Sequence, residues 1–452
     1  MWEMMPGNVY IVHHIDTEGP LYESAEEALL RIERLFGVSF GLRRNIETLE
    51  KLKAGRVQDI DSSLSESVCN ILKSAEFKKS WEEIDEMLLR ILSTNYRKRF
   101  CDSLGNSWIY NWHIVDHVGF VTNKRQRHLG YLSIFDHYTK ILKDTCSLDK
   151  VYWHFHPISL KKEAHFCATS YENSMYELHQ SLSRRLIERR WFPKVHRAGF
   201  HTERPDSNWF LEQWIPFDVS NQSIDEDVFE QSDNMNHRFG DWYGAPKDWS
   251  VYHPDLYDWR KEGHLKRYIA RCLNLNCRFR TINEYEIEQA FKKAMHENVY
   301  LGVTNHDFRE ISSEIEKFYN VLQIMSLQYP KIKYIFSDSL DAFRSVIGMS
   351  IQEIKRNRVE FELSLKDNCL KVSVINGKIF GAQPYLAIKA KNGEYFHDNM
   401  DFGDFPSEYY YTFDYQTLEL NEIEQISIAS NDSYGNTCIA EIKDQQIKKY
   451  WI

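Results

Sequence analysis

The sequence lacks several features that would place the protein in a membrane or outside the cell. No apolar run approaches the roughly 20 residues that a membrane-spanning helix needs. The first residues, Met1–Pro6, carry no basic stretch followed by an apolar one, so a secretory leader is not expected. The eight cysteines include no CxxC pair, and the two closest, Cys272 and Cys277, have no second pair at zinc-site spacing. These absences predict a cytoplasmic protein with reduced thiols and without membrane insertion.

An excess of basic residues is also absent. The chain has 56 Lys and Arg against 66 Asp and Glu, which gives a net charge of −10. Nucleic acids and anionic membranes favour basic surfaces, so we expect no nucleic-acid partner. The charge says little about a small or neutral ligand, and nothing in the sequence predicts an oligomeric state. The 452 residues, 42% of them hydrophobic and 14% aromatic, suffice for a large core in two or three domains.

Strand-like and helix-like patterns alternate over residues 1–350. The strand candidates are Val9–Ile15, Trp108–Val115, Val151–Phe155, His196–Phe200, Ile215–Val219, Val299–Thr304 and Lys333–Phe336. The helix candidates are Ala25–Leu35, Ile46–Lys53, Trp81–Leu92, Tyr171–Arg190, Glu284–His296 and Ser312–Gln328. This alternation predicts an α/β fold with a parallel sheet. In such sheets, ligands bind at the carboxyl ends of the strands.

Two further regions differ from this pattern. Residues 53–106 are polar and mostly helical, and we expect them to form an insertion that serves as a lid, an interaction surface or a plain elaboration. From about residue 356 the sequence alternates apolar and polar residues, with turn signals at Asn376-Gly377 and Asn392-Gly393. Residues 356–452 therefore read as a β-sandwich domain. No catalytic cluster stands out in it.

The first ionisable cluster follows the apolar run Val9–Val12. Side chains alternate along a strand, so His14, Asp16 and Glu18 are expected on one side, just where Gly19-Pro20 ends the strand. Two carboxylates there could supply a metal ligand and a base that activates water. The alternative is a capping or salt-bridging pair.

A second cluster, His154 and His156, closes the strand candidate before Pro157. A His-x-His on a strand directs both imidazoles the same way, and imidazole is a good ligand for divalent metals. With a carboxylate nearby, the pattern predicts a divalent metal, zinc foremost, with cobalt, nickel, manganese and iron as alternatives. The competing interpretation is a pair of partly buried histidines bonded to loop carbonyls.

Three more clusters follow strand candidates. His306, with the carboxylate of Asp307 beside it, could act as a general acid, or the two could be a structural pair. Arg197 could clamp a carboxylate and tune its pKa. The residues predicted to bind substrate are His201, Glu203 and Arg204 after Arg197, and Asp116 and His117 after the second strand candidate.

In this order, the segments resemble the polysaccharide deacetylase superfamily (NodB-like, carbohydrate esterase family 4). More narrowly, they are similar to deacetylase-like proteins of bacterial surface-polysaccharide gene clusters. Those proteins begin with a DTEGP strand and carry segments similar to RAGFHxERPDSxWFLEQWIPFD and NHDFR. Here the segments stand at Asp16–Pro20, Arg197–Asp218 and Asn305–Arg309. The resemblance covers about residues 8–345 and excludes the C-terminal β region.

The resemblance implies a distorted (β/α)7 barrel and a divalent-metal N- or O-deacetylase. It assigns the catalytic base to Asp16, the metal ligands to Glu18, His154 and His156, the motif arginine to Arg197 and the general acid to His306. Two departures from the family pattern bear on the metal site. Thr17 separates acids that are adjacent in the family, and the histidines lie two residues apart instead of four.

We therefore expect a metal-dependent hydrolase that removes an acyl group, foremost N-acetyl, from an amino sugar or glycan precursor in surface-polysaccharide biosynthesis. The rival is a catalytically inactive carbohydrate-binding or assembly protein on the same barrel. A third alternative is glycosidic cleavage, with Asp307 and either Asp16 or Glu18 as the carboxylate pair.

Overall fold

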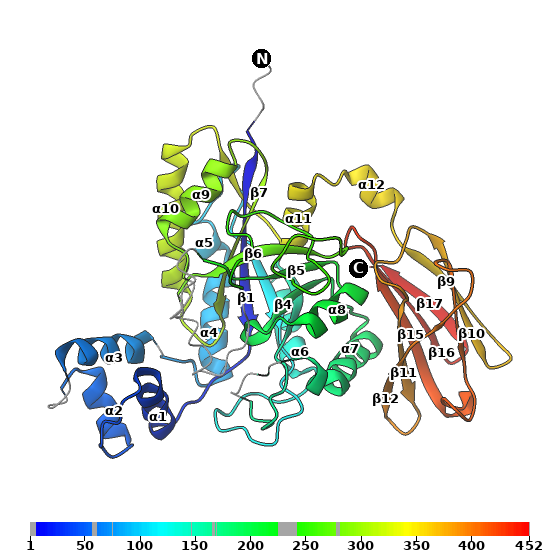
Figure 1. The fold of residues 1–452 in the computed structure, drawn as a ribbon, viewed down its shortest axis with the longest axis horizontal. Helices are drawn as coiled ribbons and strands as arrows, with labels where there is room; N and C mark the ends of the chain where they lie inside the picture. Colours follow the sequence, from blue (N-terminus) through cyan, green and yellow to red (C-terminus); the bar gives the residue numbers. More distant parts are fainter. Residues whose placement is uncertain are drawn as a thin grey trace.

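The computed structural model describes residues 6–56, 61–74, 76–145, 147–164, 168, 170–224, 242–276 and 281–451, without the side chains of residues 73, 74 and 201. Figure 1 shows a parallel barrel at the centre, a small group of helices at one end and antiparallel sheets at the other. The expected α/β barrel followed by a β-sandwich-like region is confirmed.

In the described part of the chain, strands β1–β7 close into a ring and β8 pairs with β1 outside it. The strands are β1 (Asn8–Thr17), β2 (Tyr110–Ile114), β3 (Lys150–Phe155), β4 (Val195–Ala198), β5 (Phe217–Asn221), β6 (Tyr268–Asn274), β7 (Val299–His306) and β8 (Lys333–Phe336). β1 pairs with β7 along most of its length, while β8 lies beside its first half and β2 beside its second. All pairings are parallel, so the carboxyl ends of the ring strands meet at one rim of the barrel.

The barrel interior is apolar at one end and polar at the other. Val12 of β1 belongs to an apolar cluster inside the barrel. Leu340 and Phe343 of α11 (Ser339–Ile347) complete this cluster at the end of the barrel opposite the carboxyl ends of the strands. Two residues further along β1, His14 forms hydrogen bonds with His113 of β2 at 2.8 Å and with Tyr300 of β7 at 3.0 Å. The next inward residue is Asp16. Every second side chain of β1 thus points into the barrel, and these side chains change from apolar to polar toward the carboxyl end of the strand.

Helices cover the outside of the ring. They are α4 (Trp81–Leu92), α5 (Thr94–Arg97), α6 (Ser133–Asp144), α7 (Met175–Arg189), α8 (Pro205–Trp214), α9 (Glu284–Lys293) and α10 (Ser312–Gln328). The short helix α12 (Ile351–Arg356) follows α11 and leads to the C-terminal sheets (Figure 1). The outward-facing residues of β1, Val9, Ile11 and Ile15, belong to the large core cluster that includes apolar residues of α4, α6, α9 and α10.

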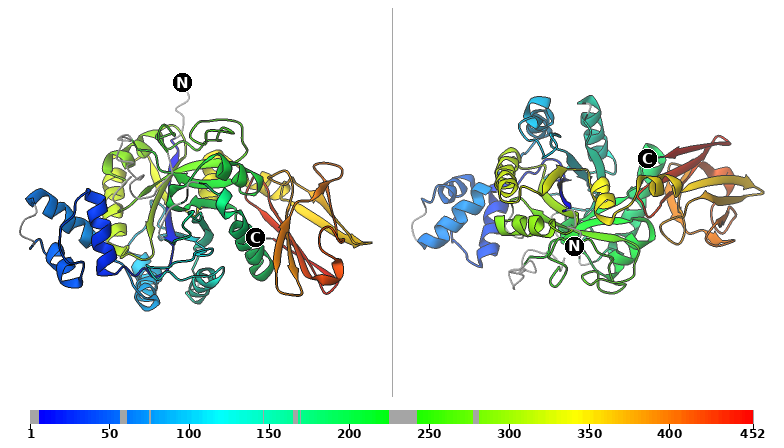
Figure 2. Two further views of the ribbon diagram at one scale, coloured as in Figure 1. Left: turned by 60° about the horizontal axis from the view of Figure 1, so that its bottom comes forward. Right: turned by 90° about the horizontal axis from the view of Figure 1, so that it is seen from above.

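Three helices after β1 stand apart from the barrel: α1 (Ala25–Phe36), α2 (Ile46–Lys53) and α3 (Ser62–Ser74). They share a small core of their own, and both views in Figure 2 show them at the end of the molecule away from the antiparallel sheets. Ser24 caps α1 by accepting the N–H of Glu27, and Gly37 ends it in the left-handed conformation. The group that stands apart thus contains α1, α2 and α3, whereas α4, expected within an insertion at 53–106, packs on the barrel through its own apolar face.

The C-terminal region consists of two antiparallel sheets around an apolar core. One sheet contains β9 (Glu360–Lys366), β10 (Cys369–Asn376), β13 (Asp401–Phe402) and β14 (Glu408–Thr412); the other contains β11 (Tyr385–Ala390), β12 (Tyr395–Asp398), β15 (Ile423–Asn431), β16 (Thr437–Lys443) and β17 (Gln446–Trp451). The second sheet packs on α7 and α8 through a shared core that includes Tyr385, Leu182 and Trp214.

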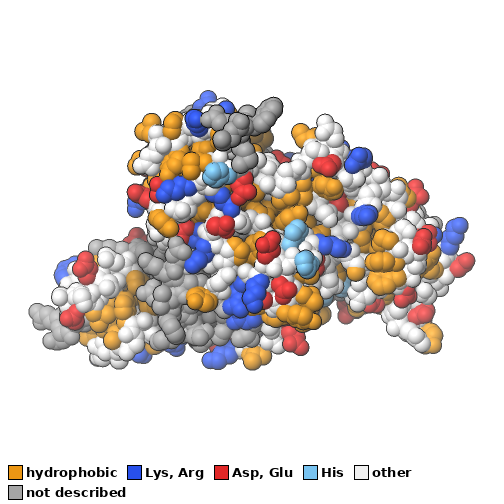
Figure 3. Space-filling view, turned by 45° about the horizontal axis from the view of Figure 1, so that its top comes forward, with side chains coloured by type: hydrophobic (Ala, Val, Ile, Leu, Met, Phe, Trp, Pro, Cys, Tyr) orange, Lys and Arg blue, Asp and Glu red, His pale blue; other side chains and the backbone are white. Residues whose placement is uncertain are grey.

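Acidic and basic side chains are interspersed over the face drawn in Figure 3. Among the residues that the structure describes, none of the helices combines the length and the apolar character required to cross a bilayer.

A buried asparagine ties the second sheet to the barrel. Asn431 at the end of β15 donates from Nδ2 to the carbonyls of Pro193 and Trp214, both at 2.7 Å, and accepts from Thr437 at 2.6 Å. We predict that Asn431→Ala lowers the free energy of unfolding by about 2–4 kcal/mol, because two buried carbonyls lose their donor. Urea unfolding measures this change. The exposed Gln416→Ala is the control, with an expected change within about 0.5 kcal/mol; equal values for the two variants would contradict the prediction.

Candidate active site

The carboxyl ends of β1, β3, β4 and β7 bring ionisable side chains together at the polar rim. β1 contributes Asp16, and Glu18 follows directly after it. β3 contributes His154, with His156 just beyond the strand end, and β4 contributes Arg197. His306 is the last residue of β7. Residues up to 290 positions apart thus meet because the parallel strands end at one rim.

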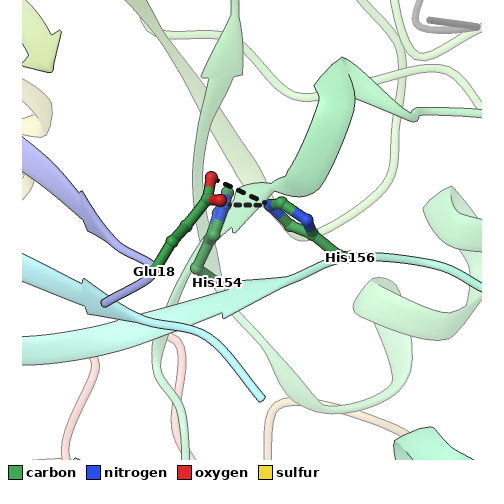
Figure 4. A group of neighbouring side chains, drawn as sticks. All are labelled: Glu18, His154 and His156. Atoms are coloured by element: carbon green, nitrogen blue, oxygen red, sulfur yellow. Dashed lines mark hydrogen bonds and ion pairs between the residues drawn. The ribbon is translucent and has the colours of Figure 1, made fainter. Parts of the chain in front are cut away.

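Glu18, His154 and His156 form a buried group whose ligand atoms lie within 4.8 Å of one another. Nε2 of His154 is 2.9 Å from Nε2 of His156, which is 3.4 Å from Oε1 of Glu18. Figure 4 shows the three side chains pointing toward one another. Two ligand atoms bound to one ion at about 2.0–2.2 Å lie roughly 2.8–3.6 Å apart. The His154–His156 and His156–Glu18 distances fall in this range, and the donor set suits a divalent cation.

The surroundings prepare His154 as a ligand. Its Nδ1 lies 2.9 Å from the carbonyl of Arg197, so Nδ1 carries the proton and Nε2 presents its lone pair to the cluster. Burial lowers the pKa of His154 to about 4, although the charge of Asp16 acts in the opposite direction. A neutral imidazole is the form that binds metal.

Close packing fixes the position of His156. A side chain on Gly199 would place its Cβ 2.2 Å from Cδ2 of His156 and 2.3 Å from the carbonyl oxygen of Phe155. The next residue, Phe200, has a φ of 53°, a left-handed conformation that is costly for an aromatic residue. Its ring centre lies 4.2 Å from that of His156. The short turn after β4 thus supports the histidine from behind.

Asp16 forms a buried ion pair with Arg197. Nε of Arg197 lies 2.8 and 3.0 Å from the two carboxylate oxygens, and Nη1 donates to the carbonyl of Val219 at 3.0 Å. Burial alone would raise the pKa of Asp16, but the charge of Arg197, followed by those of His154 and His306, lowers it to about 2. Asp16 is therefore ionised at neutral pH.

His306 is the most open of these side chains, with 24% exposure against 4–5% for the two carboxylates. Its Nε2 lies 3.7 Å from Oδ2 of Asp16 and 3.7 Å from Oε1 of Glu18. Burial lowers the pKa of His306 to about 3, against the charge of Asp16. The imidazole thus faces both carboxylates from the accessible side of the cluster.

Asp307 lies behind the Glu18 turn and is fully buried. Its oxygens accept hydrogen bonds from the N–H groups of Glu18 at 2.9 Å and Gly19 at 2.8 Å, and from the hydroxyl of Tyr138 at 2.7 Å. Burial, opposed by these hydrogen bonds, raises the pKa of Asp307 to about 7. The side chain shapes the backbone that carries Glu18, and its oxygens are engaged by the protein itself.

Two predicted substrate-binding residues after β2 differ in placement. Asp116 turns away to Arg185 of α7, at 2.8 Å, and burial raises its pKa to about 6. His117 lies beside the cluster. Its Nε2 is 3.1 Å from the carbonyl of Glu18, and its ring centre is 5.8 Å from that of His156.

The segment after β4 is divided in the same way. Glu203 is fully buried in a second charged cluster with Asp218 and Arg267; Arg267 lies 2.8 Å from Asp218 and 3.4 Å from Glu203. Burial raises the pKa of both carboxyls. Arg204 stands near the Trp259 ring, at 5.9 Å. The side chain of His201 lies outside the described residues.

Several residues that complete the site were not assigned to it from the sequence. Tyr138 of α6 supports Asp307, and Arg127 lies 2.7 Å from Oε2 of Glu18. Nothing in the sequence around Arg127 links it to Glu18, and nothing in the periodicity of α6 marks Tyr138 as functional. Both act through residues far away in the chain, so only the fold could reveal them.

Comparison of the chain with models of protein families, with curated proteins and with solved structures gave no match. The fold and the site thus carry the functional argument. A parallel β/α barrel with a buried His/Glu cluster at its rim is consistent with a NodB-like fold and suggests a metal-dependent enzyme. The cluster could hold a divalent metal.

We predict that Gly199→Ala disturbs this cluster, because the added Cβ must displace His156 or the Phe155 carbonyl. Zinc affinity, measured by competition with a chelator, is expected to fall by about tenfold or more. Gly105→Ala is the matched control: its φ is 83° and its Cβ would meet nothing within 4 Å. That variant should lose about 1–3 kcal/mol of stability through strain and keep its zinc affinity. Unchanged zinc affinity in Gly199→Ala would refute the packing argument.

Proposed function

We propose that the protein is a metal-dependent hydrolase that removes an acyl group, foremost N-acetyl, from an amino sugar or glycan precursor of surface-polysaccharide biosynthesis. The observation that carries the proposal is the cluster of Glu18, His154 and His156, with ligand atoms within 4.8 Å, next to the paired carboxylate of Asp16. This arrangement provides separate groups for holding a cation and for moving protons.

In the proposed reaction, Glu18, His154 and His156 hold the cation. A divalent cation there would polarise the acyl carbonyl and increase the acidity of a water molecule. Asp16, fixed by Arg197, accepts a proton from the attacking water. His306 lies 3.7 Å from Asp16 on the open side of the cluster, so it is placed to take that proton from Asp16 and pass it to the departing amine. Asp307 keeps the turn that bears Glu18 in place.

The substrate class follows from the resemblance and from the expected location. The deacetylase-like segments favour an N-acetyl sugar as substrate. The cytoplasmic location that the composition predicts favours a nucleotide- or lipid-linked sugar, or an oligosaccharide precursor, over a mature polymer. Glycosidic cleavage with Asp307 as one of two carboxylates is disfavoured, because both oxygens of Asp307 are bonded within the protein.

The metal assignment predicts near-stoichiometric metal in the purified protein. Elemental mass spectrometry of wild type after zinc reloading should find about one ion per chain, and His154→Ala/His156→Ala should lose most of it because two of three ligands are gone. His264→Ala, which changes an exposed histidine elsewhere on the barrel, should keep the metal. Wild type that stays free of metal after reloading with zinc, cobalt, nickel, manganese and iron would remove the basis for the hydrolase.

The catalytic assignment predicts that the roles of Asp16 and Glu18 can be separated. The zinc-loaded wild type should release acetate from a nucleotide-linked N-acetyl sugar, and a coupled acetate assay measures this release. Asp16→Asn should lower kcat by about 10²–10⁴-fold and still bind zinc, because Asp16 moves a proton and is not among the proposed ligands.

His306→Gln should also lower kcat and still bind zinc. An inactive wild type that binds the sugar with its metal site filled would favour the rival, a binding or assembly protein on the same barrel.

A further inference from the structure

Each carboxylate of the site has its own buried arginine. Asp16 is paired with Arg197, and Glu18 is paired with Arg127 across 2.7 Å between Oε2 and Nη1. Both members of the second pair are only 5% exposed. Burying two charges together is costly unless the pair is well placed. An arginine buried against one oxygen of a candidate metal ligand therefore indicates a functional role.

The loop after β2 holds Arg127 rigidly. The side-chain oxygen of Asn123 accepts the N–H of Arg127 at 2.7 Å, and its Nδ2 donates to the carbonyl of Arg127 at 2.8 Å. Within the loop, Gln126 has a φ of 49°. The guanidinium carbon lies 5.2 Å from the ring centre of Phe308, two residues beyond His306. Asn123 thus holds the backbone of Arg127 in place, and the guanidinium group lies against an aromatic ring next to the site.

The two oxygens of Glu18 face different groups. Oε1 lies 3.4 Å from Nε2 of His156 and 3.7 Å from Nε2 of His306, on the side of the cluster, whereas Oε2 faces Arg127. A carboxylate whose second oxygen is occupied presents a single oxygen to a cation. Groups that orient a metal ligand in this way typically influence metal affinity by about 10–100-fold.

We propose that Arg127 is a positioning residue of the metal site: it holds Oε2 of Glu18, so that Glu18 binds the cation through Oε1 alone, and it cancels the charge of that carboxylate. The inference rests on the metal site of the proposed function. It also has an electrostatic consequence. With Asp16 and Glu18 each compensated by an arginine, a dication held there would keep most of its charge for polarising a carbonyl.

The neighbouring Arg125 provides a matched control. It is a partly buried arginine two positions away in the same loop, but its Nη2 donates to Glu23 at 3.3 Å, in the segment that leads to α1. Replacing either arginine by methionine removes a guanidinium that is paired with a glutamate from the loop. Only Arg127 contacts a proposed metal ligand, so an effect confined to Arg127→Met separates positioning of the metal site from general loss of loop structure.

The test uses the purified full chain, freed of metal with a chelator and titrated with zinc in competition with a chromophoric chelator. Arg127→Met is expected to weaken zinc binding by about 10–100-fold, because we expect the loss of Glu18 positioning to outweigh the removal of a positive charge near the cation. Arg127→Lys, which keeps the positive charge, should recover part of the loss, and Arg125→Met should bind as wild type does. The visible spectrum of the cobalt-loaded protein should change in Arg127→Met and not in Arg125→Met, because the coordination by Glu18 changes.

The outcomes separate the inference from the proposed function. If wild type binds zinc tightly and Arg127→Met binds it equally well, with the same cobalt spectrum, the role of Arg127 is refuted and the hydrolase proposal stands. An equal loss in Arg125→Met and Arg127→Met would also refute it, since the effect would then belong to the loop. If wild type binds neither zinc nor cobalt, both proposals fail. Should Arg127→Met not fold, Arg127→Lys decides by the same two readouts.

Discussion

The buried ion pair between Asp16 and Arg197 is the interaction on which the rim of the barrel depends. It joins β1 to β4, which are not neighbours in the ring, and it places a carboxylate beside His154, whose Nδ1 is bonded to the backbone carbonyl of the same arginine. Removing one partner of a buried pair typically costs about 3–5 kcal/mol, because the other charge is left uncompensated. The pair therefore has both a structural and an electrostatic effect: it ties the two strands together and keeps Asp16 ionised.

Around this pair, fixed protein groups satisfy the remaining carboxylates. Asp307 accepts the N–H groups of Glu18 and Gly19, and Arg127 faces the outer oxygen of Glu18. The groups left facing the cluster are one oxygen of Glu18 and the Nε2 atoms of His154 and His156. Such groups are held before any ligand arrives, so binding need not reorganise them. Preorganisation of this kind is what a site for polar chemistry requires.

Local patterns in the sequence predicted much of this arrangement, and long-range pairs account for most of what they missed. The ends of β1, β3 and β7 were predictable because an apolar run precedes each ionisable cluster. β6 was not predicted, because Arg271 interrupts its apolar pattern; the fold buries that arginine against Glu286 of α9. In the same way, Glu203 was expected to bind substrate, but it pairs with Arg267, which is 64 residues away in the chain. The spacing of residues along the chain cannot predict such a partner.

The distribution of burial bears on the choice between hydrolase and binding protein. A carbohydrate-binding surface needs accessible polar and aromatic groups, whereas Asp16, Glu18, His154 and His156 are almost completely buried and only His306 is partly open. Without a cation, one N–H, that of His156, has to serve both the lone pair of His154 Nε2 and the nearby oxygen of Glu18, since the N–H of His154 is already used by a carbonyl. A cation accepts both lone pairs and the carboxylate oxygen at once. The arrangement thus favours a metal centre approached from the His306 side over a surface that only binds sugar.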